Sequence, residues 1–145
     1  LAALAAINQK YLANERFDVT NIRLVCSIDA GSYMTLDNGR PDDSYAEAYY
    51  RAAGFSNNGS WWDFTPANHI VPDKKIPPMY LIYSNDPYRT ASNESFARRL
   101  KKGNVEVKCH EVTSTTSHND MLYEFPVYSF ADSSIIQTIV SYTLN

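Results

Sequence analysis

Three short apolar runs along the chain are predicted to form β-strands. They cover Ile22 to Ile28, Met79 to Tyr83 and Val105 to Val112, and each is rich in β-branched or aromatic residues. Pro77 and Pro78 stand directly before the second run and disfavour a helix there. The pattern therefore predicts three strands that are separated by long intervening segments.

Helices are predicted between and around these strands. Residues from Leu1 to about Ala13 are rich in alanine and leucine, and the first two turns are apolar nearly all round, as in a helix packed against a sheet. Ser92 or Asn93 is expected to cap a helix from about Glu94 to Lys102, with Gly103 as its stop. Its predicted inner face consists of Phe96, Ala97 and Leu100. A last helix from Ser133 to Leu144 carries an apolar stripe of Ile135, Ile136, Ile139, Val140 and Leu144.

This alternation of helices and strands indicates the α/β class, with parallel strands covered by helices. Residues 32–73, between the first two strands, form a long irregular insertion of the kind that often serves as a lid or cap. A helix is possible within it from Asp42 to Ala53. Its aromatic residues can either line a pocket or close the core over the sheet, and these are Tyr33, Tyr49, Tyr50, Trp61, Trp62 and Phe64.

The composition of the chain argues against some classes of function. A chain of 145 residues fits one domain, and a net charge of −3 with scattered basic residues argues against a nucleic-acid surface. No run approaches the length of a membrane span, so we expect a soluble protein, cytoplasmic rather than secreted. Cys26 and Cys109 lie in predicted strands and are expected to be buried free thiols.

An acid and a histidine follow two of the predicted strands. Asp86 comes shortly after the second strand and His118 follows the third, at the positions where open α/β sheets place reactive groups. Asp86 can also be read as a turn or cap residue, because Pro87 follows it. Asp29 and Asp120 are competing acids, and we interpret Asp29 as a turn or pocket-rim residue.

The other two histidines are weaker candidates for chemistry. His110 lies within a predicted strand, and His69 lies where the insertion returns to the sheet. His110, His118 and Asp120 do not have a recognisable metal-ligand spacing. We therefore expect no metal site and no cofactor.

Three segments together resemble a known family. Leu1 to Ala6 is similar to the helix after a nucleophile elbow, Pro77 to Asp86 to the strand and turn that present a triad acid, and Ser117 to Met121 to a triad histidine loop. In this order they resemble the C-terminal half of an α/β-hydrolase of the esterase, lipase and arylformamidase-like branch. The resemblance covers nearly all of the chain, although each motif is short.

The resemblance implies a Ser-His-Asp triad that cleaves small-molecule carboxylic esters. His118 would act as general base and acid, and Asp86 would orient it. No Gly-x-Ser-x-Gly occurs in the sequence. We therefore expect residues 1–145 to be the C-terminal portion of one α/β-hydrolase domain and to be inactive alone. The serine and the oxyanion hole would then lie before Leu1 or on an N-terminal partner chain.

Two alternatives stay open. The chain can belong to a non-catalytic α/β-hydrolase relative that serves as a binding or interaction module. It can also be a small doubly wound ligand-binding domain that is complete in itself, although its sheet would then have an unpaired edge. Labelling by a fluorophosphonate distinguishes the enzyme from both, because only an activated serine reacts.

Overall fold

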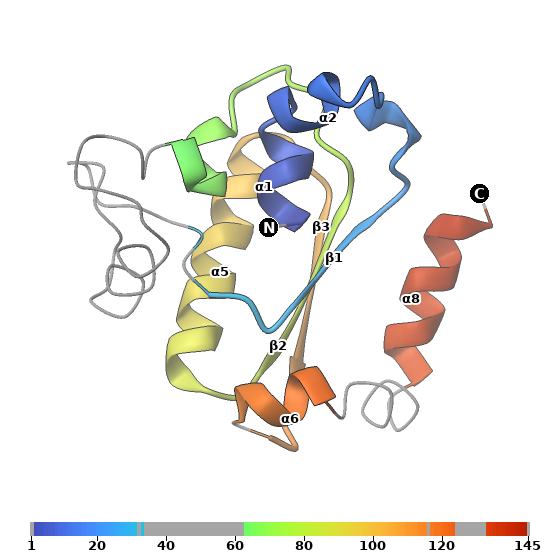
Figure 1. The fold of residues 1–145 in the computed structure, drawn as a ribbon. Helices are drawn as coiled ribbons and strands as arrows, with labels where there is room; N and C mark the ends of the chain where they lie inside the picture. The colour runs from blue at the N-terminus through green and yellow to red at the C-terminus, as the bar shows by residue number, and fades with distance from the viewer. Residues whose placement is uncertain (1, 32, 34–62, 116, 124–132, 145) are drawn as a thin grey trace.

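A three-stranded parallel sheet forms the centre of the protein (Figure 1). The computed structural model describes residues 2–31, 33, 63–115, 117–123 and 133–144. The strands lie in the order β1 (Val25–Ile28), β2 (Met79–Ser84) and β3 (Val107–Val112), and both neighbouring pairs are parallel. The predicted α/β class and its three parallel strands are confirmed.

The outer strands begin later than predicted. Met79 pairs with Val25 on one side and with Val107 on the other, so all three strands start at the same level. Pro77 and Pro78 come directly before β2 and have no N–H groups with which to continue a ladder. The segments before Val25 and Val107 are therefore not paired as strands.

The predicted first helix is divided into α1 (Ala2–Ile7) and α2 (Lys10–Asn14). Ala3, Leu4, Ala6 and Ile7 are buried, which confirms that α1 packs against the sheet. The break lies at Asn8, whose side-chain amide contacts Nε2 of His69 at 3.3 Å. Asn is a weak helix former because its side chain can replace the hydrogen bonds of the helix backbone.

Helix α5 (Pro87–Lys102) begins at Pro87 rather than near Glu94 as predicted. Asp86 is its N-cap, and Oδ1 of Asp86 accepts a hydrogen bond from the backbone N–H of Arg89 at 3.0 Å. A proline in the first turn has no N–H to leave unsatisfied there. The predicted end at Gly103 and the buried inner face of Phe96, Ala97 and Leu100 are confirmed.

The two faces of the sheet are covered by different helices (Figure 1). Helices α1 and α5 pack against one face, over a cluster that includes Met79, Leu81 and Phe96. Helices α6 (His118–Tyr123) and α8 (Ser133–Thr143) pack against the other face, over a cluster that includes Tyr80 and Ile82. The predicted stripe of α8 is only partly correct: Ile135 is fully buried and Ile139 packs on the cluster, whereas Val140 and Leu144 are exposed.

Part of the predicted insertion belongs to the core. Tyr33 is buried and stacks on Phe96 with the ring centroids 4.1 Å apart. A 3-10 helix, η2 (Pro66–His69), and the residue Ile70 place further apolar side chains on the same cluster. A second 3-10 helix, η1 (Val19–Asn21), precedes β1. The possible helix from Asp42 to Ala53 and the other aromatic residues before residue 63 lie outside the described residues.

The two cysteines are both free, as expected. Cys26 is half-buried, but Cys109 is exposed, so the prediction of a buried thiol is wrong for Cys109. Cys109 lies in β3, which is an edge of the sheet in the described part of the chain. Among the described helices, none is long and apolar enough to cross a membrane.

Two buried tyrosines make stability sensitive to alkaline pH. Burial raises the pKa of Tyr83 from 10.0 to about 12, and burial also raises the pKa of Tyr33, against the opposing effect of its hydrogen bond to Ser27. Between pH 10 and 12 the unfolded chain therefore releases protons that the folded state keeps. The free energy of unfolding should fall there, with a limiting slope of about 1.4 kcal/mol per pH unit for each tyrosine.

Urea unfolding at pH 9 and pH 11 measures this loss. The expected result is a lower midpoint at pH 11, and a smaller difference in Tyr83→Phe. Equal midpoints at the two pH values in the unsubstituted protein would show that these phenols are not held in their protonated form.

Candidate functional site

The carboxyl ends of the three strands bring together residues that are far apart in the sequence. Ile28 of β1 pairs with Ile82 of β2, so Asp29 and Ser84 both lie at this edge of the sheet. After β3 the chain turns, and α6 begins at His118, at the same end of the sheet (Figure 1). Side chains from the end of β1, the end of β2 and the start of α6 therefore meet.

Asp29 is the buried centre of this group. Its side chain is fully buried, and its Oδ1 accepts two hydrogen bonds from Ser84, from the backbone N–H at 2.7 Å and from the hydroxyl at 2.8 Å. Its Oδ2 lies 2.7 Å from Nδ1 of His118. A carboxylate in such a place is stable only when its oxygens are well hydrogen-bonded. Both of its oxygens have close partners.

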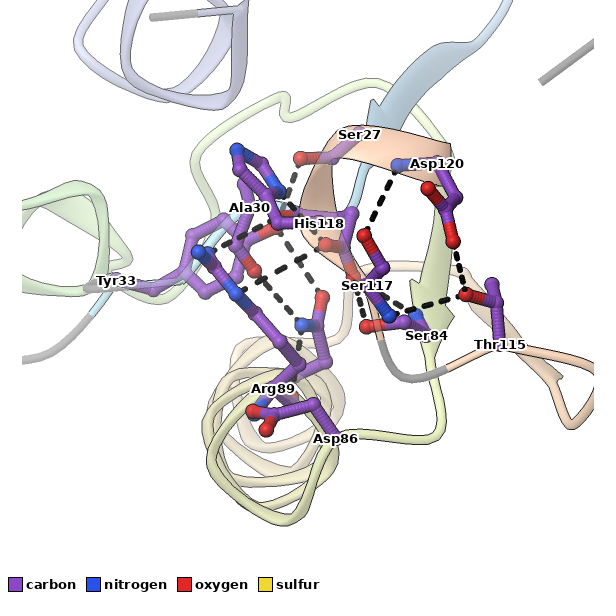
Figure 2. A network of polar contacts seen from close by, with 12 residues as sticks. Ser27, Ala30, Tyr33, Ser84, Asp86, Arg89, Thr115, Ser117, His118 and Asp120 are labelled. Carbon is purple, nitrogen blue, oxygen red and sulfur yellow. Dashed lines mark hydrogen bonds and ion pairs between the residues drawn. The ribbon is translucent and has the colours of Figure 1, made fainter. Parts of the chain in front are cut away.

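His118 is held by the turn that begins α6 (Figure 2). The hydroxyl of Ser117 accepts a hydrogen bond from the N–H of Asp120, and the Thr115 hydroxyl accepts one from the N–H of Ser117. The Thr115 hydroxyl also donates a hydrogen bond to Oδ2 of Asp120. The backbone carbonyl of Thr115 accepts a hydrogen bond from the N–H of Asn85, which follows β2. His118 was predicted in a loop, but it is the first residue of a short helix that is anchored to the sheet.

The two nitrogens of the His118 ring have different surroundings. Nδ1 contacts Asp29, whereas Nε2 has no hydrogen-bond partner among the residues that the structure describes. The side chain is 42% exposed, although the carboxylate beside it is inaccessible. A carboxylate that fixes one nitrogen and leaves the other accessible is the arrangement of a general base and its orienting acid.

Asp86 does not take the place beside His118 that the sequence suggested. Its carboxylate caps α5, and Figure 2 shows it at the start of that helix, with Arg89 between it and His118 in this view. The acceptor beside Nδ1 of His118 is Oδ2 of Asp29, a residue for which the sequence favours a turn or pocket-rim position. The expected pairing of Asp86 with His118 is therefore corrected to Asp29 with His118.

The backbone of Asp29 is also unusual. Its φ is +47°, in the left-handed region that residues with a side chain seldom occupy, although Asp tolerates it better than most. Such a conformation costs on the order of 1 kcal/mol and tends to occur at functional sites. The turn directs the Asp29 carboxylate toward the end of β2 and the start of α6.

The remaining candidates from the sequence have other partners. Asp120 accepts a hydrogen bond from the Thr115 hydroxyl, and Nε2 of His69 lies 2.8 Å from the carbonyl oxygen of Asp63. His110 lies in β3 with its ring edge-on to that of Tyr80, at 6.5 Å between centroids. Within the described ranges, no group of three or more His, Cys, Asp or Glu residues is arranged to hold a metal ion.

A comparison of the sequence with models of protein families finds no match, and neither does a comparison with curated proteins. The site is therefore interpreted from the contacts of its own residues.

Proposed function

We propose that this chain supplies the histidine and the acid of a serine hydrolase that acts on carboxylic esters. The observation that carries the proposal is the 2.7 Å contact between Nδ1 of His118 and Oδ2 of Asp29, at the carboxyl edge of a parallel sheet. The resemblance of three segments to an α/β-hydrolase supports the same class. The sheet edge is where this kind of fold places its reactive groups.

In this mechanism His118 transfers protons between a serine and the ester. Nε2 accepts the serine hydroxyl proton while the serine oxygen bonds to the ester carbonyl carbon. His118 then gives that proton to the leaving alcohol oxygen as the ester bond breaks. Water repeats the cycle on the acyl-enzyme and releases the carboxylic acid. Throughout, Asp29 keeps the proton of the neutral ring on Nδ1 and stabilises the imidazolium that forms.

The nucleophile is assigned to sequence outside these 145 residues. The chain has no Gly-x-Ser-x-Gly, and the resemblance of Leu1 to Ala6 to a post-elbow helix puts the elbow directly before Leu1. A partner chain is the second possible source of the serine and of the oxyanion-hole donors. Under this proposal, experiments on activity use the full-length protein with any sequence that precedes Leu1.

The acid is assigned to Asp29 rather than to Asp86. The resemblance favours Asp86, but the carboxylate of Asp86 is engaged with the N–H of Arg89. Asp29 is fully buried and is the residue that contacts the histidine. Asp86 then has the structural task of starting α5.

A fluorophosphonate probe tests the proposed class directly. We expect one serine of the full-length protein to be labelled, at a position before Leu1, with hydrolysis of short p-nitrophenyl esters lost in parallel. His69→Gln controls for the general effect of replacing a histidine, because His69 contacts the carbonyl of Asp63 away from the site. It should be labelled like the unsubstituted protein.

Absence of labelling both in the full-length protein and in any chain that copurifies with it would contradict the proposal. The contact between Asp29 and His118 would then be structural, as the alternative of a non-catalytic binding module requires. Labelling of a serine within residues 1–145 would keep the hydrolase class but would refute the position of the nucleophile.

A further inference from the structure

Helix α5 places two side-chain donors one turn apart against the turn that contains Asp29. Nη1 of Arg89 donates to the carbonyl oxygen of Asp29 at 3.0 Å, and Nδ2 of Asn93 donates to the carbonyl oxygen of Ala30 at 2.8 Å. Residues four apart in a helix lie on the same face, so one face of α5 contacts two consecutive carbonyls. These carbonyls belong to the turn in which Asp29 is left-handed.

Asn93 is fixed in orientation by its other partners. It is fully buried, and its Nδ2 also donates to the carbonyl oxygen of Arg89 at 2.9 Å. Its Oδ1 accepts a hydrogen bond from the Tyr33 hydroxyl at 3.2 Å, and that hydroxyl lies 2.7 Å from Oγ of Ser27 in β1. Both amide hydrogens and the amide oxygen are thus used, which leaves the side chain one favourable orientation.

Arg89 contacts both the backbone and the side chain of Asp29. Besides its bond to the carbonyl, its Nε lies 3.8 Å from Oδ2, the oxygen that also contacts His118. The Arg89 side chain is only 15% exposed. A planar guanidinium can reach two acceptors of one residue at once, whereas a lysine ammonium is a single point charge. Figure 2 shows Arg89 between α5 and the site.

Gly31 makes room for the guanidinium. A Cβ at this position would lie 2.9 Å from Nη1 of Arg89 and 2.9 Å from Cε1 of Tyr88. Real Cβ atoms do not approach other atoms so closely, so Gly31→Ala must displace these side chains. This substitution changes no polar group of the site and offers a second way to disturb Arg89.

We propose that Arg89 and Asn93 are positioning residues, which hold Asp29 in its left-handed conformation so that Oδ2 meets Nδ1 of His118. Without them the turn can relax toward the more favourable right-handed or extended regions. The carboxylate would then move away from the histidine. This inference rests on the proposed function for its effect on catalysis, but the contact itself can be measured without activity.

The test compares Arg89→Ala with Arg98→Ala in the full-length protein. Arg98 lies in the same helix, is 65% exposed and pairs with Glu94, away from Asp29. For Arg89→Ala we expect kcat on p-nitrophenyl acetate to fall about 100-fold, since small misplacements cost this much, while KM changes little. Millimolar guanidinium chloride should restore part of the lost kcat. Arg98→Ala should keep the original kcat.

A kcat for Arg89→Ala equal to that of the unsubstituted protein would overturn the inference, and so would a loss that guanidinium does not restore in a folded variant. If Arg89→Ala fails to fold, Arg89→Met decides, because it keeps the length of the side chain and removes its donors: a similar loss of kcat supports the inference, and an unchanged kcat overturns it.

A second readout separates this inference from the proposed function. Long-range proton–nitrogen NMR reports whether the proton of His118 stays on Nδ1. If neither the unsubstituted protein nor any chain that copurifies with it reacts with a fluorophosphonate, the hydrolase proposal fails. The positioning role still stands if Arg89→Ala or Gly31→Ala shifts the proton of His118 away from Nδ1. It fails if the proton stays on Nδ1 in both variants.

Discussion

Replacing His118 with alanine is expected to lower kcat for ester hydrolysis by about 10⁶-fold in the full-length protein, on the scale of removing the histidine of a serine protease triad. The physical reason is that Nε2 is the group that takes the serine proton and returns it to the leaving group. Without it the serine stays a weak nucleophile. KM should change much less, because His118 is proposed to contact the reacting atoms rather than to bind the rest of the substrate.

The matched control for this substitution is His69→Ala. His69 has Nε2 near the Asp63 carbonyl and the Asn8 amide, so its loss should affect local packing but not kcat. Steady-state kinetics with p-nitrophenyl acetate, together with the rate of fluorophosphonate labelling, measure both variants. Retention of more than about one tenth of kcat in His118→Ala would be incompatible with a general base at this position.

Asp29→Asn is expected to lower kcat by about 10⁴-fold while the protein remains folded. Asparagine has nearly the same shape and tolerates the left-handed conformation, so the turn at φ +47° can be kept. Its amide oxygen can still accept from Ser84, but its NH₂ group then faces Nδ1 of His118. The neutral ring must then carry its proton on Nε2, and Nε2 can no longer accept the serine proton.

Asp86→Asn is the companion variant, because Asp86 is the acid that the resemblance favours. Asn is as good an N-cap as Asp, so α5 should stay intact and kcat should stay near that of the unsubstituted protein. Asp86→Ala should lose about 1 kcal/mol of stability with the cap, again without a large loss of kcat. If Asp86→Asn instead lost 10⁴-fold and Asp29→Asn did not, the family resemblance would be the better guide.

The strands, the first buried helix and the inner face of α5 could be predicted from the sequence because they depend on local composition. The apolar run from Met79 to Tyr83 is buried along its whole length, as a central parallel strand requires. The predicted start of α5 near Glu94 was wrong, although the sequence contains the signal for a start at Pro87. An Asp followed by Pro is a common N-cap and first-turn pair, and it marks Asp86 as a capping residue.

The choice between two acids could not be made from spacing alone. Asp29 and Asp86 both follow strands whose carboxyl ends lie at the same edge of the sheet. The contacts that distinguish them are non-local: Ser84 and Arg89 lie 55 and 60 residues from Asp29, and His118 lies 89 residues away. The left-handed turn at Asp29 also depends on these contacts. Sequence periodicity does not report where such side chains point.

The contact of Asp29 with His118 is tested most directly by the protonation of the imidazole ring. Long-range proton–nitrogen NMR of the neutral ring distinguishes a proton on Nδ1 from one on Nε2, and it needs neither substrate nor nucleophile. We predict that His118 carries its proton on Nδ1 in the unsubstituted protein and in Asp86→Asn, and on Nε2 in Asp29→Asn. A proton on Nε2 in the unsubstituted protein, or a tautomer that changes in Asp86→Asn but not in Asp29→Asn, would contradict the pairing.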